Sequence, residues 1–211
     1  MHLILVRHGE TDWNVSLQYQ GHAAVPLNAR GREQAHRTAQ RLATYGAVAL
    51  YTSDLLRAAQ TAEIMSGPLK LAPRVMSDLR EIDVGQWEGL PPEELYRRFP
   101  EQMQAYQRDP ARTVRAGGES YAQLQTRAVR ALKQIQANHQ LGELVVAVSH
   151  GGTIRALLCD IIGLDLAHFG RLWLDNGSLT ELRYDRHGWR LVRLNDAAHL
   201  EGLFEVGGAL H

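Results

Sequence analysis

Residues 3–11 read LILVRHGET, and this stretch decides the fold. A short apolar run with β-branched residues, closed by Gly9, is typical of a buried strand. Such a strand delivers Arg7 and His8 to its carboxyl end, where Gly9 permits a sharp turn close to a ligand. A neutral imidazole is a nucleophile that needs no prior deprotonation. A single histidine is more often an ordinary residue, so a catalytic His8 needs support from the rest of the chain.

A second stretch, residues 144–152 with the sequence LVVAVSHGG, repeats this order of strand, histidine and glycine. Residues 144–149 form the strongest strand pattern in the chain, and His150 follows directly. Gly151 begins a helical pattern that runs to about Ile162. Free backbone N–H groups at the N-terminus of a helix suit an anion such as phosphate. Taken alone, His150 also fits an incidental residue at a helix cap.

Strand and helix patterns alternate along most of the chain. Besides the segments above, helical patterns cover residues 29–45, a segment ending near Met65, 92–99 and 120–138, and strand patterns cover 47–51, 179–184 and 189–194. The last two strands are close enough to form a hairpin. This alternation predicts a three-layer α/β/α sandwich with a mainly parallel sheet. Ligands bind beyond the carboxyl ends of such strands, where both histidines are expected.

Local signals mark the ends of these elements, because proline favours helix starts and glycine or short polar residues favour caps. The expected boundaries are Gly46 after the first helix, Thr52, Ser53 or Asp54 before the second, and Pro91-Pro92 and Pro100 around the third. Residues 9–28 are polar and predict a loop, and Val75 lies in a short strand. Residues 195–211 give no clear assignment.

The composition argues against several classes of protein. Lys plus Arg and Asp plus Glu both number 23 among 211 residues, and this balance argues against a non-specific nucleic-acid-binding protein. No apolar run reaches membrane-spanning length and residues 1–10 lack signal-peptide features, so we expect a cytoplasmic protein without membrane contact. The single cysteine, Cys159, permits no intramolecular disulfide and lies in an apolar helical pattern, where we expect it to be buried.

Two further polar clusters are candidates for chemistry. Arg57 falls in the first turn of a helix that follows a strand, and a planar guanidinium group suits phosphate. Residues 79–89, LREIDVGQWEG, contain three carboxylates, of which one could protonate a leaving oxygen as a general acid. Each cluster on its own also fits a solvated helical arginine or a polar loop.

Together, these clusters resemble the histidine phosphatase superfamily, also called phosphoglycerate mutase-like. The resemblance spans residues 3 to about 160 in family order and rests on Arg7-His8-Gly9-Glu10-Thr11, Trp13-Asn14, Gln20-Gly21, Pro26-Leu27-Asn28, Gly31, Gln34-Ala35, the Arg57 and Glu81 segments, Gly118-Glu119-Ser120 and the His150 segment. It implies a single α/β domain over residues 1–211. One departure is Ala24, where many relatives have Asp, and it affects the hydrogen bonding of that loop.

The resemblance also implies the reaction. His8 corresponds to the nucleophile that becomes phosphohistidine, and Glu81 to the acid for the leaving alcohol and then the base for water. The family uses neither a metal nor another cofactor here, since positioned cations neutralise the phosphoryl oxygens. A reaction with one acid and one base predicts a bell-shaped pH profile.

The resemblance assigns the phosphate pocket as well. The residues that correspond to the groups holding the phosphoryl oxygens are Arg7, Arg57 and His150. The resemblance therefore counts them as catalytic residues too. Asn14, Gly21 and Gly151 correspond to neighbouring phosphate contacts. The expected partner is a small phosphorylated metabolite.

Three functions on this scaffold remain open from the sequence. The compact interval between the Glu81 and His150 motifs and the glycine at position 152 favour a phosphatase, since glycolytic mutases of the family tend to be longer there and to carry Asn. The pattern is closest to the α-ribazole phosphatase and broad-specificity phosphatase branch. A phosphoglycerate mutase is the alternative, and a non-catalytic regulatory protein is the third reading.

Four segments outside these motifs carry further expectations. Residues 86–118 are expected to cover the pocket, and residues 197–211 form a C-terminal tail that could fold over its mouth. Residues 172–174 or the hairpin at 179–194 are candidate dimer surfaces, so a homodimer is a candidate assembly.

Overall fold

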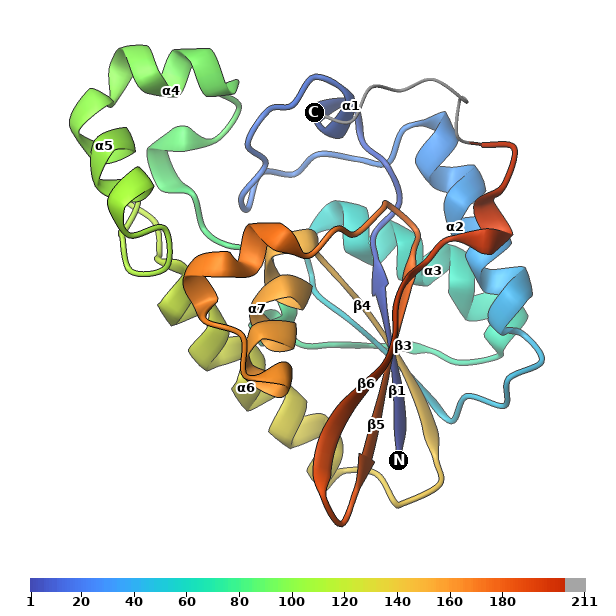
Figure 1. The fold of residues 1–211 in the computed structure, drawn as a ribbon. Coiled ribbons are helices and arrows are strands. Elements are labelled where there is room, and N and C mark those ends of the chain that lie inside the picture. Colours follow the sequence, from blue (N-terminus) through green and yellow to red (C-terminus); the bar gives the residue numbers. More distant parts are fainter. Residues whose placement is uncertain (204–211) are drawn as a thin grey trace.

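The computed structural model describes residues 1–203, in which one sheet carries helices on both faces (Figure 1). The strands are β1 (His2–Arg7), β2 (Ala49–Thr52), β3 (Pro73–Val75), β4 (Leu144–Ser149), β5 (Leu179–Asp185) and β6 (Gly188–Asp196). The α-helices are α1 (Asp12–Val15), α2 (Ala29–Leu42), α3 (Leu56–Leu69), α4 (Pro92–Arg98), α5 (Pro100–Arg108), α6 (Tyr121–Ala137) and α7 (Gly151–Ile162). Short 3₁₀ helices are η1 (Ser77–Leu79), η2 (Gly85–Trp87), η3 (Leu166–Arg171) and η4 (Ala198–Leu200).

The sheet is mixed, with the strand order β3-β2-β4-β1-β5-β6. Neighbouring strands are parallel from β3 to β1, and the β5–β6 hairpin adds two antiparallel strands at one edge. The predicted α/β/α sandwich with a mainly parallel sheet is therefore confirmed.

Strand β1 is apolar throughout because both of its faces are covered. Leu3 and Leu5 join the core formed with α6 and α7, whereas Ile4 and Val6 join the core formed with α2 and α3. Figure 1 shows these two helix pairs on opposite sides of the sheet. A strand buried on both faces reads as a continuous apolar run rather than an alternating one, which explains the sequence of residues 3–6.

The carboxyl ends of β1, β2 and β4 meet at one edge of the sheet. Arg7 is level with Ser149 across the β1–β4 pair, and Thr52 is level with Val148 across the β2–β4 pair. The backbone N–H of His8 donates to the Ser149 carbonyl at 3.0 Å. The residues that follow the three strands are therefore neighbours in space although about 50 to 140 positions separate them in the chain.

Two predicted boundaries near the N-terminus are wrong. Residues 12–15 form the short helix α1 inside the expected loop, because Thr11 and Asn14 make a reciprocal capping box. Helix α2 ends at Leu42 instead of residue 45, since the chain tightens into a turn before Gly46, whose φ is +72°.

Both predicted bounds of α3 are also wrong, and the helix α5 was not predicted. The cap residue of α3 is Leu55, whose apolar side chain cannot form a cap bond, and the expected cap residue Ser53 uses its hydroxyl for His150 instead. The helix continues past Met65 to Leu69. Pro100 not only follows α4 but also begins α5, since proline is readily accepted at the first position of a helix.

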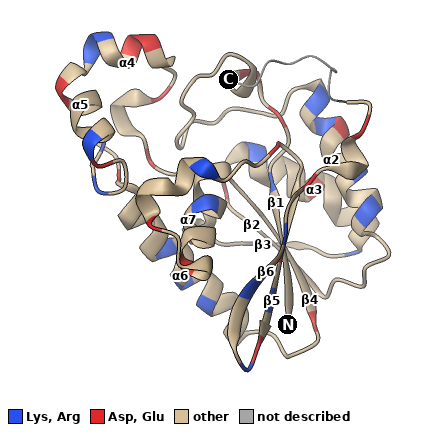
Figure 2. Cartoon of the chain, in the orientation of Figure 1, with Lys and Arg blue, Asp and Glu red and all other residues tan. Residues whose placement is uncertain are grey.

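The remaining elements agree with the predicted ones to within about two residues, and Cys159 is buried as expected. Figure 1 shows α4 and α5, from the expected covering segment, standing beside the N-terminal loop at one end of the sandwich. Figure 2 shows charges of both signs on α4, whereas the charged residues of α6 are all basic. Within residues 1–203, no helix is both long and apolar enough to cross a membrane.

The predicted tail at residues 197–211 is only partly described. It contains η4, and Leu200 is buried there. Phe204 and Val206, which the expectation of a folded-back tail included, lie outside the described residues.

Candidate active site

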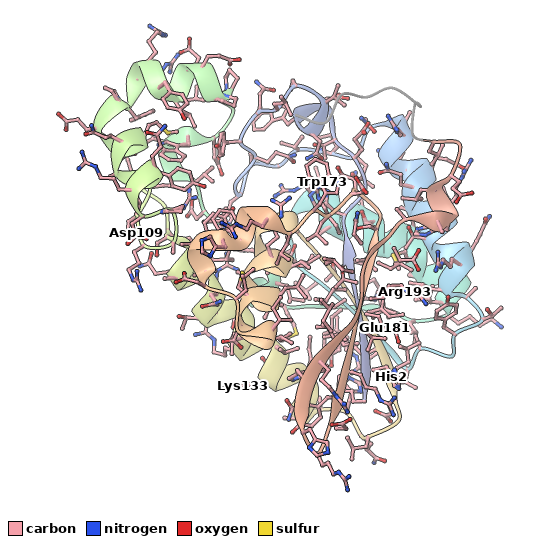
Figure 3. The ribbon with its side chains drawn as sticks, viewed as in Figure 1. His2, Asp109, Lys133, Trp173, Glu181 and Arg193 are labelled. Carbon is pink, nitrogen blue, oxygen red and sulfur yellow. The ribbon has the colours of Figure 1, made fainter. Side chains whose placement is uncertain are left out.

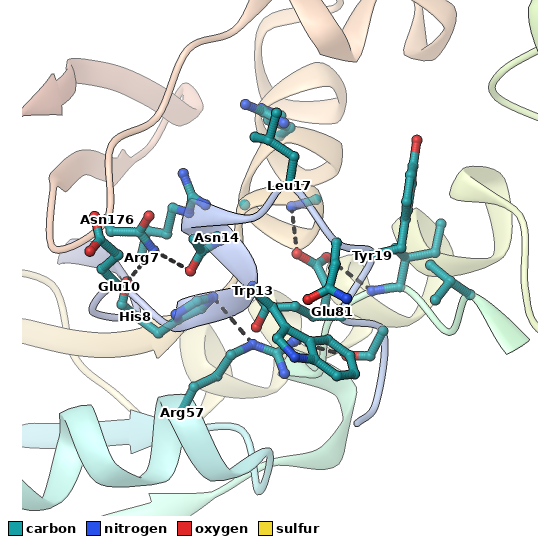
Figure 4. Close-up of a pocket in the computed structure, with 18 of the residues that line it drawn as sticks. Arg7, His8, Glu10, Trp13, Asn14, Leu17, Tyr19, Arg57, Glu81 and Asn176 are labelled. Atoms are coloured by element: carbon teal, nitrogen blue, oxygen red, sulfur yellow. Dashed lines mark hydrogen bonds between the residues drawn. The ribbon is translucent and has the colours of Figure 1, made fainter. Parts of the chain in front are cut away.

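Two histidines and an arginine from three strand ends converge at the carboxyl edge of the sheet. The ring centroids of His8 and His150 lie 5.1 Å apart, and Arg57 Nε lies 3.3 Å from His8 Nε2. Figure 4 shows the Arg57 side chain directed at His8. All three side chains are at most 3 % exposed. The convergence follows from the parallel pairing of β1, β4 and β2, so each strand contributes the residues that follow it.

The hydrogen bonds of His8 fix its tautomer. Arg57 Nε–H can only donate, so His8 Nε2 accepts with a lone pair. The proton of a neutral ring is then on Nδ1, which donates to the carbonyl of Gly9 at 2.7 Å. The Gly9 N–H donates in turn to Thr61 Oγ1 at 3.1 Å, which holds this turn in place. Nε2 is therefore an unprotonated nitrogen held in a fixed direction.

Two guanidinium groups provide positive charge beside His8. Burial lowers the pKa of both Arg7 and Arg57 to about 10, so both remain cations at neutral pH. Arg57 donates to the carbonyls of Gly21 at 2.8 Å and Ala23 at 3.3 Å, and Arg7 Nη1 donates to Leu174 at 2.5 Å. The buried Nε of Arg7 has no hydrogen-bond partner among the described residues, so it is a donor available to an anion.

Both histidines are held neutral by their surroundings. Burial lowers the pKa of His8 well below its ordinary value, and the guanidinium groups of Arg57 and Arg7 lower it further. Burial also lowers the pKa of His150, and the charge of Arg57 lowers it further. His150 Nε2 lies 2.7 Å from Ser53 Oγ, and its buried Nδ1 has no partner in the described part of the chain. If the serine donates to Nε2, Nδ1–H is a further free donor.

These lowered pKa values predict a loss of stability in weak acid. Below about pH 6.5 an unfolded chain protonates both histidines and the folded chain does not, so the free energy of unfolding falls as the pH drops, by about 1.4 kcal/mol per pH unit for each ring. Above that pH both rings are neutral in the folded and the unfolded chain, so this loss of stability is absent. Urea unfolding between pH 7.5 and 5.5 measures it, and His8→Asn should reduce the slope. An equal slope in the variant would contradict the assignment to His8.

Glu81 faces the N-terminus of α7 in the same cavity. Its Oε2 accepts from the Gly152 N–H at 3.0 Å, and its Oε1 accepts from its neighbour Ile82 at 2.9 Å. The carboxyl group lies against Gly152 so closely that a Cβ there would be 2.4 Å from Oε1. A side chain at position 152 is thus incompatible with this position of Glu81.

With the acid role that the family resemblance implies for Glu81, Gly152→Ala is expected to lower kcat/KM for a phosphomonoester by about 10- to 100-fold, because a displaced acid loses most of its contribution. The control is Gly67→Ala, since a Cβ at that helical glycine meets nothing within 4 Å. Alanine at this position should leave the activity unchanged, although no gain in stability is expected because Gly67 precedes Pro68 within the helix. Activity of the Gly152 variant equal to that of the control would show that Glu81 is not needed where it lies.

These groups line a cavity of about 570 Å³. The sequence-predicted residues on its wall are Arg7, His8, Asn14, Gly21, Arg57, Glu81 and Gly151. His150 is not on the wall and lies fully buried beside His8. Gly21 has a φ of +48°, and a Cβ there would meet Val84 at 2.5 Å, so glycine allows the loop to pass close to the covering segment.

Asn14 and a residue that sequence reasoning missed, Asn176, are neighbours on the wall. Asn14 Oδ1 accepts from the backbone and hydroxyl of Thr11, which leaves its amide nitrogen for the cavity. Asn176 Nδ2 donates to the His8 carbonyl at 3.0 Å and lies 3.3 Å from Asn14 Oδ1. Ser53, the partner of His150, was also missed, because its sequence position indicated a helix cap. Asn176 lies in an irregular segment without a recognisable signal.

The mouth of the cavity is partly apolar. Trp173 and Leu17 lie on its wall and are 56 % and 63 % exposed. Figure 3 shows Trp173 at the end of the molecule opposite His2, as expected for the carboxyl ends of the parallel strands. Pro92 and Arg115 from the expected covering segment also line the cavity. The site therefore has a cationic floor and a mixed wall, an arrangement suited to a phosphate group with an organic substituent.

Comparisons with known proteins agree with this geometry. The model of the histidine phosphatase superfamily (branch 1) matches residues 3–197. "Phosphoserine phosphatase 1" of Hydrogenobacter thermophilus is 33 % identical over 198 residues, covering 94 % of this chain and 93 % of the relative. "Probable phosphoglycerate mutase GpmB" of Yersinia enterocolitica is 37 % identical over 212 residues, covering 95 % of each. A mycobacterial glucosyl-3-phosphoglycerate phosphatase structure superposes with a TM-score of 0.84 at 31 % identity, covering 93 % of this chain and 99 % of that one.

Proposed function

This chain belongs to the histidine phosphatase superfamily (branch 1), and from its site we propose a metal-independent phosphatase that hydrolyses small phosphomonoesters through a phosphohistidine on His8. The observation that carries the proposal is the lone pair of His8 Nε2, which faces Arg57 in a cavity whose floor is cationic. A neutral, oriented imidazole among guanidinium donors is what an in-line attack on phosphorus requires.

In the first step the Arg57 Nε–H turns from His8 Nε2 to a phosphoryl oxygen, the freed lone pair of Nε2 attacks phosphorus, and the bond from phosphorus to the alcohol oxygen breaks. The electron pair of that bond goes to the oxygen, which takes a proton from the carboxyl group of Glu81. Arg7 and Arg57 hold the phosphoryl oxygens, and the free donors at Arg7 Nε and His150 Nδ1 find their acceptors there. The ring becomes an N-phosphorylated cation that keeps its Nδ1 proton on the Gly9 carbonyl.

In the second step water attacks the phosphoryl group while the carboxylate of Glu81 accepts its proton. The phosphorus–nitrogen bond breaks, and its electron pair returns to His8 Nε2. Inorganic phosphate leaves, and the neutral ring and the protonated Glu81 are restored. One carboxyl group thus serves both steps, because the alcohol departs from the position that water then occupies.

The positive charge for both steps comes from residues of this chain around the cavity. Two guanidinium groups and the start of α7 at Gly151 face the proposed phosphate position, with Asn14 and Gly21 at its border. The unpartnered Nδ1 of His150, buried beside His8, adds a further donor. We propose on this ground that the reaction proceeds in EDTA and needs no other cofactor.

The alcohol part of the substrate is proposed from the relatives and the wall of the cavity. The named relatives act on phosphoserine and glucosyl-3-phosphoglycerate, whose alcohols carry a carboxylate. Arg115 lies on the cavity wall, and its buried Nε has no partner among the described residues, so an anionic substituent would find a donor there. Phosphoserine and the phosphoglycerates are therefore the first substrates to test.

Phosphoglycerate mutase is the second candidate function, because a relative bears that name. A mutase returns the phosphoryl group of His8 to a phosphoglycerate instead of to water. Gly152 and its contact with Glu81 favour the phosphatase, since Asn, which mutases tend to carry at this position, would collide with the carboxyl group as it stands.

The test is phosphate release from a panel of phosphomonoesters in EDTA, with interconversion of the two phosphoglycerates followed in the same samples. Rapid acid-free quenching and mass spectrometry should find the phosphoryl group on His8. Phosphate release with that intermediate supports the phosphatase, whereas interconversion that exceeds release identifies a mutase. Absence of both with every substrate would favour a regulatory role on this scaffold.

Two finer parts of the proposal concern location and assembly. The single cysteine leaves no disulfide to form within the chain, which suits a cytoplasmic location. A homodimer is proposed through the segment of Trp173, which is 56 % exposed, and sedimentation of Trp173→Ser against the natural chain tests it.

A further inference from the structure

Glu81 lies in a segment, residues 80–84, that has no regular secondary structure. Backbone carbonyls in such a segment need partners from elsewhere in the fold. Side chains of β4 and α7 provide some of these, since Ser149 donates to the Leu79 carbonyl at 2.9 Å and Thr153 to the Arg80 carbonyl at 2.7 Å. The position of Glu81 therefore depends on side chains outside its own segment.

Arg127 on α6 binds more of these carbonyls than any other side chain in the described residues. Its Nη1 donates to the carbonyls of Asp78 at 3.0 Å and Arg80 at 2.7 Å. Its Nη2 donates to the carbonyl of Glu81 itself at 2.7 Å. One guanidinium group thus fixes three backbone positions around the proposed acid.

Glu119 holds Arg127 in this orientation. Both carboxylate oxygens of Glu119 accept from the guanidinium group, and Oε1 also accepts from the Asp83 N–H at 2.9 Å. The side chains of Arg127 and Glu119 are only 15 % and 17 % exposed, so this pair is more than a surface ion pair. Together the two side chains bind the backbone on both sides of Glu81.

We propose that Arg127 is a positioning residue for the acid–base step, acting through the backbone of Glu81 from the side away from the substrate. The proposal rests on the proposed role of Glu81 as acid and base. Arg127 is not on the wall of the cavity, so it does not contact the substrate. A planar fork with several donors can hold three carbonyls and a carboxylate at once, whereas the single ammonium group of lysine cannot.

A change of leaving group separates this role from a general structural one. Benzyl phosphate and 4-nitrophenyl phosphate have similar shapes, but benzyl alcohol is a poor leaving group that needs a proton and 4-nitrophenolate leaves without one. Since kcat/KM covers the steps up to loss of the alcohol, a misplaced acid should lower it only for the benzyl ester. The second step needs Glu81 with both esters, so kcat should fall for both.

For Arg127→Met we expect kcat/KM to fall about 10- to 100-fold with benzyl phosphate and less than about threefold with 4-nitrophenyl phosphate. With 4-nitrophenyl phosphate, kcat and KM should both fall by similar factors. A burst of nitrophenol should precede slow turnover. Arg127→Lys keeps the charge and should share these defects. Combined with Glu81→Gln, the arginine change should cause no further loss, because both act through one group.

Arg130→Met is the matched control. Arg130 lies one turn further along α6 and pairs with the Asp78 carboxylate, but it contacts no carbonyl around Glu81 and its side chain is 65 % exposed. It should retain full activity with both esters.

Three outcomes would overturn the proposal. They are equal losses of kcat/KM with the two esters, full activity of Arg127→Lys, and additive losses with Glu81→Gln. Thermal unfolding and binding of inorganic phosphate check that each variant folds. Absence of turnover of either ester by the natural chain would instead count against the proposed phosphatase, so the two failures are distinguishable.

Discussion

His8→Ala is expected to lower kcat/KM for the best phosphomonoester by more than about 10⁴-fold, because no other group can take the place of its nitrogen. The nearest alternative is His150, whose ring centroid is 5.1 Å away. Its Nε2 is bonded to Ser53, and its Nδ1 is proposed to carry the proton that donates to a phosphoryl oxygen, so His150 offers no lone pair for attack on phosphorus. The remaining guanidinium groups should still bind phosphate, and binding should persist while turnover disappears.

Phosphate release in EDTA and calorimetric titration with inorganic phosphate measure these two properties. His36→Ala is the control, since His36 is an exposed histidine on α2 away from the cavity, and it should behave as the natural chain does. Turnover by His8→Ala within about tenfold of the natural rate would exclude a phosphohistidine on this residue.

The parts of this site that sequence could predict are those that follow strands. His8 and His150 come directly after the two most apolar runs of the chain, and parallel strands necessarily end at a common edge. Two local patterns therefore predicted a contact across about 140 residues. The family resemblance then added roles for Arg57, Glu81 and Asn14, and all three line the same cavity as His8.

The residues that sequence could not predict act through contacts that leave no local pattern. Ser53 looks like a helix cap because its neighbours are short polar residues, yet its hydroxyl bonds a histidine 97 positions away. Arg127 looks like a solvated arginine on an amphipathic helix until the carbonyls of residues 78–81 are placed beside it. Such roles depend on which backbone groups remain unpaired after folding, and only the tertiary structure determines that.

Arg57→Lys is expected to lower kcat/KM by about 10³-fold, although it keeps a positive charge at the position. Arg57 uses its fork to bind the carbonyls of Gly21 and Ala23 while its Nε faces His8 Nε2. Lysine has one compact donor group and cannot hold the loop and face the phosphoryl group together. Buried carbonyls that lose their donor should also lower the free energy of unfolding by about 1–3 kcal/mol.

Steady-state kinetics and urea unfolding of the same preparation separate the two effects. Because Arg57 is proposed to hold phosphate in both the ground state and the transition state, KM should rise and kcat should fall. Arg74→Lys is the matched control, since Arg74 is an exposed arginine that lies over the ring of Tyr51, away from the cavity. If Arg57→Lys retains kcat/KM to within about threefold, charge alone suffices at this position, and the fork of Arg57 has no part in holding the transferred phosphoryl group.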